Sequence, residues 1–372
     1  MRKTQEIAVK KVKLPAADRL RKNPEARHRV AGLGLALLTS CLLAASTVAT
    51  TPGATAPAGP AKKPLYGVNL AGAAFAPEKL PGKVGTDYIY PDKAIADLFV
   101  TQGFDTVRLP ILWERIQPEP FKPLSKQEMA WVDASIKDLD GFKTILVDVH
   151  NYARYRGKRL DQTADGGAML ADLWTRLAEH YKASPKIAFG VMNEPFDIDA
   201  RAWRKLADQS VAAIRKTGAT NLLLIPGTRW TGAHSWMEGG DGSNAAAFAD
   251  FKDPGNNFMF EFHQYLDPDS SGTQDKCLDA EAGSRRLEDA TQWLRAHKAR
   301  GLLGEFGGTS SPVCLKALEN MMAYLDANTD VWAGWTYWAA GAWWGGYPMS
   351  IQPGDDGRQK PQMEVLQRHM QR

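Results

Sequence analysis

Hydrophobic positions along the chain fall into short, nearly continuous runs that alternate with longer stretches in which apolar residues recur with helical spacing. Short runs rich in Val, Ile, Leu and Phe, with little polar alternation, are typical of strands that are buried on both faces. We predict eight such strands, at 65–70, 106–110, 144–150, 187–193, 222–226, 257–262, 302–305 and 331–338.

The longer stretches predict amphipathic helices, because one face of each is apolar and the other is polar. Six lie between predicted strands and a seventh closes the chain: 91–102, 125–140, 168–182, 201–216, 284–298, 312–328 and 363–371. Residues 227–256, with many Gly and a weak helical pattern, are expected to form loops. Strands that alternate with helices form parallel sheets, and eight of them predict an α/β fold, a closed (β/α)8 TIM barrel, as a single domain over residues 64–372.

The first 49 residues have a different pattern. Met1 to Val30 hold ten Lys and Arg against three acidic residues, and an uncharged apolar segment that ends in small residues follows. A basic region before a short apolar core predicts an export signal. Two alternatives stay open, a retained membrane anchor and lipid attachment at Cys41, and each places the folded part outside the cytoplasm, secreted or periplasmic. Residues 50–63, rich in Pro, Ala and Thr, predict a linker.

Composition narrows the possible partners. The chain has 372 residues, of which 44% are hydrophobic and 24% charged, close to the averages of soluble globular proteins. Its formal charge of +4 comes from the basic N-terminus, and without residues 1–30 the remainder is mildly acidic. A folded part without a basic surface excludes nucleic acid as the expected partner. A membrane would be a partner only if the N-terminal segment is retained, and we expect a monomer.

Two cysteines, Cys277 and Cys314, remain after the leader. Because an exported domain reaches a compartment that permits disulfides, we predict that they are bridged. The alternative is two independent buried thiols.

Chemically capable side chains gather where the predicted strands end. The carboxyl ends of all strands of a parallel barrel meet at one face, which is where barrel enzymes carry their active sites. The residues at these ends, from the second strand to the eighth, are Arg108, His150, Asn151, Asn193, Glu194, His263, Tyr265, Glu305 and Trp338.

Glu194 and Glu305 follow the fourth strand and end the seventh, so a barrel would place them across its mouth from each other. Two carboxyl groups about 5 to 5.5 Å apart can hydrolyse a glycosidic bond with retention, one as acid/base and the other as nucleophile. Arg108 would keep Glu305 ionised and Tyr265 would hydrogen-bond it. Glu194 would then need a raised pKa, so that it is protonated in the resting state.

Seven segments in order give this sequence a specific resemblance. They are Gly67-Val-Asn-Leu-Ala-Gly72, Val107-Arg-Leu-Pro110, Asp148-Val-His-Asn-Tyr152, Met192-Asn-Glu-Pro195, Phe262-His-Gln-Tyr-Leu-Asp267, Gly304-Glu-Phe-Gly307 and Thr336-Tyr-Trp-Ala-Ala-Gly-Ala-Trp-Trp-Gly345. The chain resembles glycoside hydrolase family 5 cellulases, and within them the subfamily 5 endoglucanases, over nearly all of residues 66–349.

The resemblance implies a retaining endo-β-1,4-glucanase that acts on β-1,4-glucan without a cofactor or metal. It implies that Glu194 is the acid/base and Glu305 the nucleophile, and that a cis peptide follows Trp338. The residues that would complete the site are Arg108, His150, Asn193, His263, Tyr265 and Trp338. We further expect Trp236, Trp343 and Trp344 to line sugar subsites, because aromatic faces pack against sugar rings.

Arg229 departs from the small polar residue expected of relatives in this loop.

Three other functions are alternatives to this one. The same chemistry on mannan, mixed-linkage glucan or xyloglucan is the nearest. A non-catalytic carbohydrate-binding barrel is disfavoured because both carboxylates are present, and a metal-dependent hydrolase is disfavoured by the few histidines near the mouth.

Overall fold

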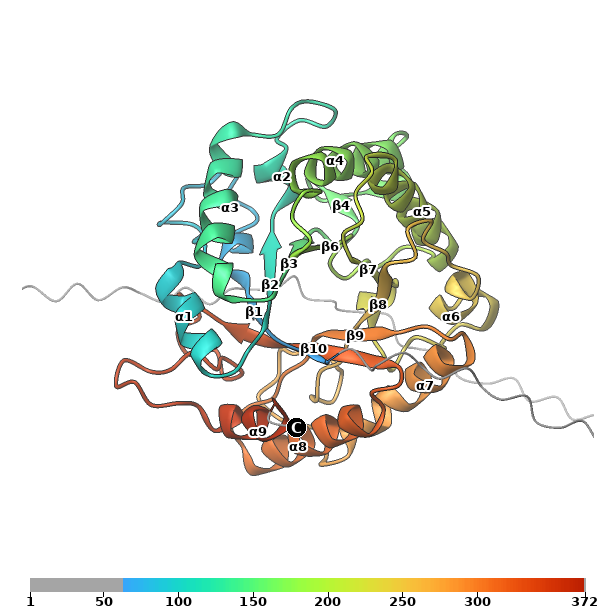
Figure 1. Ribbon diagram of the computed structural model, residues 1–372. Helices are drawn as coiled ribbons and strands as arrows, with labels where there is room; N and C mark the ends of the chain where they lie inside the picture. Colours follow the sequence, from blue (N-terminus) through green and yellow to red (C-terminus); the bar gives the residue numbers. More distant parts are fainter. Residues whose placement is uncertain (1–62, 371–372) are drawn as a thin grey trace, which may run out of the picture. The chain divides into compact units, whose positions relative to one another are not determined.

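The computed structural model describes residues 63–370 and confirms the predicted barrel. Eight parallel strands close into a ring in chain order, so each strand lies between its two neighbours in the sequence (Figure 1). They are β1 (Leu65–Leu70), β2 (Thr106–Ile111), β3 (Thr144–Val149), β6 (Ile187–Gly190), β7 (Leu223–Pro226), β8 (Phe258–His263), β9 (Gly301–Glu305) and β10 (Trp332–Ala340). The predicted export signal, and all of the predicted linker except residue 63, lie outside the described residues.

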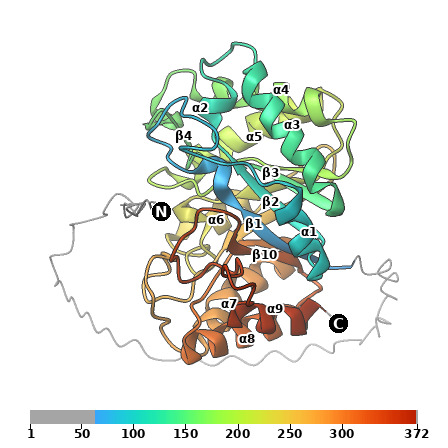
Figure 2. The same ribbon diagram turned by 90° about the vertical axis from the view of Figure 1, so that its left-hand side faces the viewer.

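Helices surround the strands, as Figures 1 and 2 show from two directions. They are α1 (Lys93–Thr101), α2 (Trp113–Ile116), α3 (Lys126–Asp138), α4 (Gly166–Tyr181), α5 (Ala200–Lys216), α6 (Asn244–Phe248), α7 (Ala282–Ala296), α8 (Pro312–Ala327) and α9 (Pro361–Met370). All seven predicted helices are present with ends shifted by at most two residues. The stretch 227–256, expected as loops, also holds the five-residue α6.

Polar caps begin several of these helices. Asp92, Ser125 and Ser311 each accept a hydrogen bond from a backbone N–H in the first turn of α1, α3 and α8. Such a cap satisfies one of the four N–H groups that a helix start leaves without a partner. Pro312 follows Ser311 at the first helical position, where a missing N–H costs nothing.

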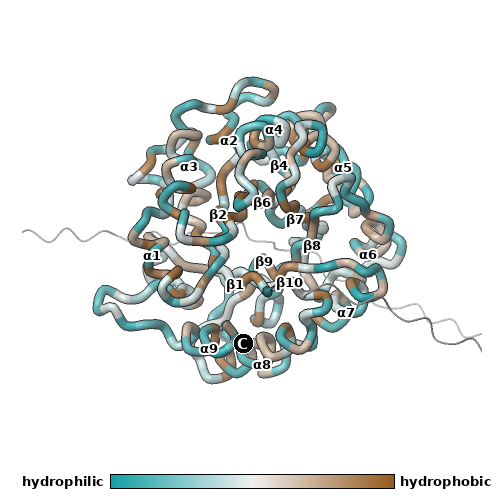
Figure 3. Tube along the Cα trace, viewed as in Figure 1, coloured by the Kyte–Doolittle hydropathy of each residue, from teal (hydrophilic) through white to brown (hydrophobic). Residues whose placement is uncertain are grey.

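The barrel interior is closed at its lower end by a small apolar layer. Leu146, Ala188, Leu224 and Leu302 form a buried cluster contributed by β3, β6, β7 and β9. A second and much larger apolar core fills the space between the strands and the helices. In Figure 3 hydrophilic residues mark outer loops such as 352–360, before α9. The buried cluster thus forms an apolar layer beneath the polar side chains of the barrel interior.

From this apolar layer toward the carboxyl ends of the strands, the side chains that point into the barrel become polar. Side chains alternate along a strand, so β8 directs Met259, Glu261 and His263 into the barrel in succession. On β3 the same alternation places Asp148 directly above Leu146. Glycines on the neighbouring strands leave room for these carboxylates, since a Cβ at Gly304 would lie 2.4 Å from the Glu261 carboxylate.

The predicted pairing of Cys277 with Cys314 is confirmed. The disulfide joins the loop after β8 to the first turn of α8.

Two very short strands, β4 (Arg154–Tyr155) and β5 (Lys158–Arg159), form a hairpin after β3 that the hydrophobic pattern did not indicate. Among residues 63–370 no helix has both the length and the hydrophobicity that a membrane crossing requires.

Candidate active site

Glu194 and Glu305 meet at the carboxyl ends of the strands. Glu305 is the last residue of β9, and Glu194 lies four residues beyond the end of β6 in a left-handed backbone conformation, with φ of 41°. Carboxylate oxygens of the two residues and a ring nitrogen of His263 all lie within 4.8 Å of one another. This spacing is that of the carboxyl pair in retaining glycosidases, and it is shorter than the roughly 6.5–9.5 Å of inverting ones.

Arg108 is the cation at the centre of the site. It is 1% exposed, and its Nη1 donates to Glu305 Oε1 at 2.8 Å. Nη2 donates to Asn193 Oδ1 at 2.8 Å and lies 3.1 Å from Asp148 Oδ1. Burial alone would lower the pKa of this guanidinium, but the surrounding carboxylates outweigh it and raise the pKa. Arg108 therefore remains charged and holds Glu305 in place.

Tyr265 fixes the second oxygen of the same carboxylate. Its hydroxyl donates to Glu305 Oε2 at 2.8 Å. Burial, and then the charge of Glu305, raises the pKa of the phenol well above its usual value, so the proton stays on the tyrosine. Glu305 is thus oriented at both oxygens by groups that do not release their protons.

Asn193 carries a donor that the protein leaves available. Its Oδ1 accepts from Arg108, which directs the amide nitrogen away from the guanidinium. Nδ2 is buried and has no hydrogen-bond partner among the described residues. A buried polar group without a partner is costly unless something else binds it, so this amide is suited to a ligand hydroxyl.

His263 lies between three carboxylates. Its Nδ1 is 2.7 Å from Glu194 Oε1 and 3.5 Å from Glu305 Oε2, and its Nε2 is 3.3 Å from Glu261 Oε1. Burial opposes the charge on the ring, but Glu305, Glu194 and Glu261 outweigh it and raise its pKa to about 10. The histidine is accordingly an imidazolium that donates hydrogen bonds.

Glu194 is the carboxyl group that favours its protonated form. Burial raises its pKa above the usual value, and the negative charge of Glu305 adds to this. The contact with His263 acts in the opposite direction and limits the rise. Two carboxyl groups in different environments, one paired with Arg108 and one in partial contact with solvent, can take different roles in acid–base chemistry.

His150 and Trp338 form one wall of the site. His150 Nδ1 lies 2.8 Å from Asp148 Oδ2, which fixes the ring. The ring stacks on Trp338 with centroids 5.7 Å apart and an interplanar angle of 10°. The peptide bond from Trp338 to Ala339 is cis, as the family resemblance implied. Together they offer a flat aromatic face next to the carboxylates.

The cluster also has the composition of a possible metal site. Glu194, His263 and Glu305 are the group among the described residues whose ligand atoms come close enough to hold an ion. An imidazolium has no lone pair to offer, however, and Arg108 already neutralises Glu305. The electrostatics of the cluster therefore suit acid–base chemistry better than a cation.

One predicted subsite residue serves the fold instead, which corrects the prediction for it. Trp236 is fully buried and packs against Phe262 and Trp293, with ring centroids 4.5 and 5.2 Å away, so it cannot contact a sugar. Asn151 is buried as well. Its Nδ2 donates to Glu114 and its Oδ1 accepts from the backbone N–H of Trp113, so it takes a supporting role and holds the start of α2.

The remaining aromatic predictions lie in the loop after β10. Trp344 packs edge-on against Trp338, with ring centroids 5.6 Å apart, and remains a predicted subsite residue. Trp343 is 47% exposed and remains a predicted subsite residue. On the opposite side, Trp230 is 49% exposed and stacks on Phe196 at 4.9 Å. The sequence pattern did not single out Trp230.

Three further polar positions of the site lie within strands and not at their ends, so the pattern of strand ends did not predict them. Asn69, Asp148 and Glu261 are fully or almost fully buried within β1, β3 and β8 and surround Arg108. Each interrupts an otherwise apolar strand with a polar residue on its inward side. That interruption was the available signal, because a buried charge needs a partner.

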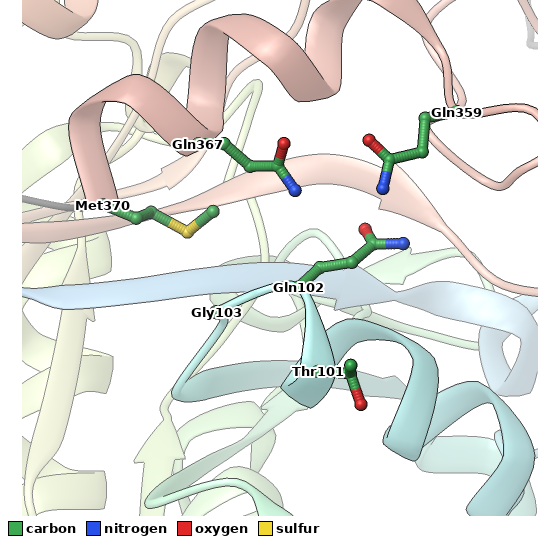
Figure 4. Close-up of a pocket in the computed structure, with 6 residues that line it drawn as sticks. All are labelled: Thr101, Gln102, Gly103, Gln359, Gln367 and Met370. Atoms are coloured by element: carbon green, nitrogen blue, oxygen red, sulfur yellow. The ribbon is translucent and has the colours of Figure 1, made fainter.

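A separate hollow of about 500 Å³ lies between the end of α1 and α9. Figure 4 shows the amides of Gln102, Gln359 and Gln367 directed into it, with Met370 at its edge. It lies near the start of β2, which is the end of the barrel opposite to the carboxylates. Its lining holds no acid or base, so it does not compete as the reactive site.

The barrel and its paired carboxylates define a glycoside hydrolase of the retaining type. The family model for cellulase (glycosyl hydrolase family 5) matches residues 66–341, and the chain belongs to this family.

Proteins that are similar in sequence and in structure support this family assignment. Endo-β-1,4-glucanase B of Aspergillus niger is 34% identical over 307 residues, which cover 82% of this chain and 90% of the relative. The solved structure of an endo-β-1,4-glucanase from Xanthomonas axonopodis pv. citri superposes with a TM-score of 0.81 at 46% identity, covering 83% of this chain and 98% of the other. Pseudomonas stutzeri endoglucanase Cel5A, in complex with cellobiose, gives a TM-score of 0.75 at 32% identity, covering 82% and 92%.

Proposed function

We propose that this protein is a retaining endo-β-1,4-glucanase that cleaves internal bonds of cellulose-type chains. Its membership of the family, and relatives named as endo-β-1,4-glucanases over most of its length, support the activity. The observation that carries the mechanism is the pair of carboxylates from Glu194 and Glu305, whose oxygens lie within 4.8 Å.

In this mechanism Glu305 attacks the anomeric carbon while Glu194 gives its proton to the departing glycosidic oxygen. The bond from the carbon to that oxygen breaks, and a covalent glycosyl ester forms on Glu305. Glu194, now a carboxylate, then takes a proton from water as the water oxygen attacks the same carbon and releases Glu305. Two inversions give net retention, and no cofactor or metal takes part.

Neighbouring groups supply the electrostatics. Arg108 and Tyr265 bind one carboxylate oxygen of Glu305 each and fix its orientation, which supports a nucleophile. The free amide of Asn193 is available for the 2-hydroxyl of the sugar, a contact that strengthens as positive charge develops on the ring. The face of Trp338 provides an apolar platform for that sugar.

The partner of the site is therefore a β-1,4-glucan chain, bound by a monomer. We also propose that residues 1–49 direct export, because a secreted enzyme can reach a polymer that does not enter the cell. A second substrate class, another β-glycan such as mannan or xyloglucan, would use the same carboxylates and differ only in the surrounding contacts.

Reducing-sugar release from carboxymethylcellulose, mixed-linkage glucan, mannan and xyloglucan, measured side by side, tests the proposal. We expect the fastest release from the first two, with the anomeric configuration retained when products are followed by NMR. Activity confined to mannan would overturn the substrate, and inverted products would overturn the mechanism. Glu305→Gln should abolish hydrolysis while binding to the polymer persists; unchanged turnover would contradict the role of Glu305.

A further inference from the structure

Glu261 is a buried carboxylate that the mechanism above does not use. It lies on β8 with 1% exposure, two residues before His263, so both side chains point into the barrel. Its Oε1 is 3.0 Å from Arg108 Nε and 3.3 Å from His263 Nε2. Its Oε2 is buried without a hydrogen-bond partner among the described residues. A carboxylate in this position is expensive to keep unless it serves the groups around it.

The barrel is built to hold this side chain. A Cβ at Gly304, on the neighbouring strand β9, would lie within 2.4 Å of the Glu261 Oε1, so only glycine leaves enough space there. Gly304 immediately precedes Glu305, and β9 has to carry both the space for one carboxylate and the other carboxylate itself. The fit is specific to a side chain of this length and direction.

His263 is held at both ring nitrogens. Nδ1 faces Glu194 Oε1 at 2.7 Å and Nε2 faces Glu261. A ring with a carboxyl group at each nitrogen donates from both, and its charged form is favoured. With Nε2–H directed to Glu261, the ring presents Nδ1–H to Glu194. Oε1 of Glu194 is then an acceptor, which leaves Oε2 to carry the proton that is transferred.

We propose that Glu261 is a positioning residue for proton transfer, because it holds His263 as a charged, correctly turned donor to Glu194. This rests on the proposed role of Glu194 as the acid/base. When Glu194 gives its proton to the glycosidic oxygen, the new Glu194 carboxylate accepts a hydrogen bond from the fixed Nδ1–H of His263. The same contact holds that carboxylate while it takes a proton from the attacking water.

Five of the strands contribute charged or titratable groups to the surroundings of His263. These are Arg108 from β2, Asp148 from β3 with His150 and Tyr152 beyond it, Glu194 after β6, Tyr265 after β8 and Glu305 from β9. Removal of a negative charge from their midst lets carboxyl groups ionise at lower pH and lets the imidazolium lose its proton at lower pH. All these shifts have the same sign.

The test is the pH profile of kcat/KM for Glu261→Gln, which keeps the shape of the side chain and removes its charge. We expect both limbs to move to lower pH by about one unit. We expect kcat to fall about 10- to 100-fold, the range known for loss of the carboxylate partner of a metal-bound histidine. A folded variant with the wild-type profile would overturn the proposal, because a purely structural role would change only thermal stability.

Two further variants distinguish the effect of losing the Glu261 charge from the effect of losing stability. Glu261→Asp retains the charge on a shorter side chain and should shift both limbs by less than Glu261→Gln does, even if it melts at lower temperature. Glu128→Gln removes a different buried carboxylate, one on α3 that accepts from the hydroxyls of Tyr88 and Tyr90. It should lower the melting temperature and leave the profile unchanged.

A measurement on the wild-type protein covers the case in which Glu261→Gln does not fold. Nitrogen NMR of ¹⁵N-labelled histidine should show His263 protonated at both nitrogens at pH 7 and 8. A neutral His263 ring at pH 7 would overturn the proposal. Failure of the wild-type protein to hydrolyse any β-glucan would instead overturn the proposed function, so the two failures are distinguishable.

Discussion

Glu194 must hold a proton at the start of the reaction, and its surroundings favour that form. Burial and the charge of Glu305 raise its pKa, while His263 limits the rise. General acid catalysis typically contributes about 10²- to 10⁴-fold to a rate. Glu194→Ala should therefore lower kcat on carboxymethylcellulose by about that factor.

The control is a substrate whose leaving group needs no proton. A dinitrophenyl cellobioside should still form the glycosyl ester on Glu305 in Glu194→Ala, and a burst of dinitrophenolate should precede slow turnover. Without such a burst, or with equal losses in the rate of glycosyl-ester formation on both substrates, Glu194 would not be the acid.

The same pKa direction fixes the sign of the pH dependence. A carboxyl group with a raised pKa stays protonated to higher pH than the usual value of about 4.3. The wild-type enzyme should keep its activity on glucan above that pH and lose it as pH rises through the pKa of Glu194. Measured as the rate of glycosyl-ester formation, this alkaline limb should disappear with the dinitrophenyl substrate. A limb of equal position on both substrates would assign it to another group.

Single residues show where sequence reasoning succeeds and where it stops. Glu194, Glu305 and Arg108 were predictable because they stand at the ends of apolar runs, and parallel strands bring such ends together. The partners Asp148 and Glu261 lie within strands, and only the register of the closed barrel turns them toward Arg108. That register depends on strand tilt and pairing, which a hydrophobic pattern does not contain.

At the level of elements, the loop between β7 and β8 gives the clearest difference between pattern and structure. Its many glycines predicted an irregular surface segment, and Trp236 within it was expected to meet substrate. The segment instead folds back so that Trp236 enters the core beside Trp293 of α7. An aromatic residue in a loop has no periodic neighbours to reveal its direction, so burial could not be inferred from the sequence.

This placement predicts opposite effects for two tryptophans. Trp236→Ala removes a fully buried indole and should lower the free energy of unfolding by about 3–5 kcal/mol. Its KM for soluble glucan should remain near the wild-type value, because the side chain lies in the core. Urea unfolding followed by tryptophan fluorescence, together with steady-state kinetics, checks both.

The matched control is Trp343→Ala in the loop after β10. Its side chain is 47% exposed, so stability should change by no more than about 0.5 kcal/mol. If Trp343 contacts a sugar, KM should rise while the unfolding midpoint stays constant. A wild-type KM would remove Trp343 from the predicted subsites, and a stable Trp236→Ala would contradict the burial of Trp236.

For the molecule as a whole, the barrel was predictable because its closure follows from a count of alternating strands and helices. The eight strands follow one another around the barrel in chain order, so their arrangement can be predicted without knowledge of the loops. The loops at the carboxyl ends of the strands surround the candidate site, and their conformations depend on contacts between distant segments. Arg115 illustrates this: it binds backbone carbonyls of Ala73 and Phe75 and so holds the loop after β1.

The disulfide is the covalent counterpart of such long-range contacts. Cys277 and Cys314 are 37 residues apart in the sequence, and closing a loop of this length stabilises a protein by about 4 kcal/mol in the chain-entropy model, as an upper value. Replacing both by Ala should shift the denaturant midpoint downward and leave kcat at 25 °C nearly unchanged, because β9 and the end of β6 position the carboxylates. Reduction of the wild-type protein should reproduce the shift. Equal midpoints for oxidised and reduced protein would show that packing against α8, and not the covalent link, holds this loop.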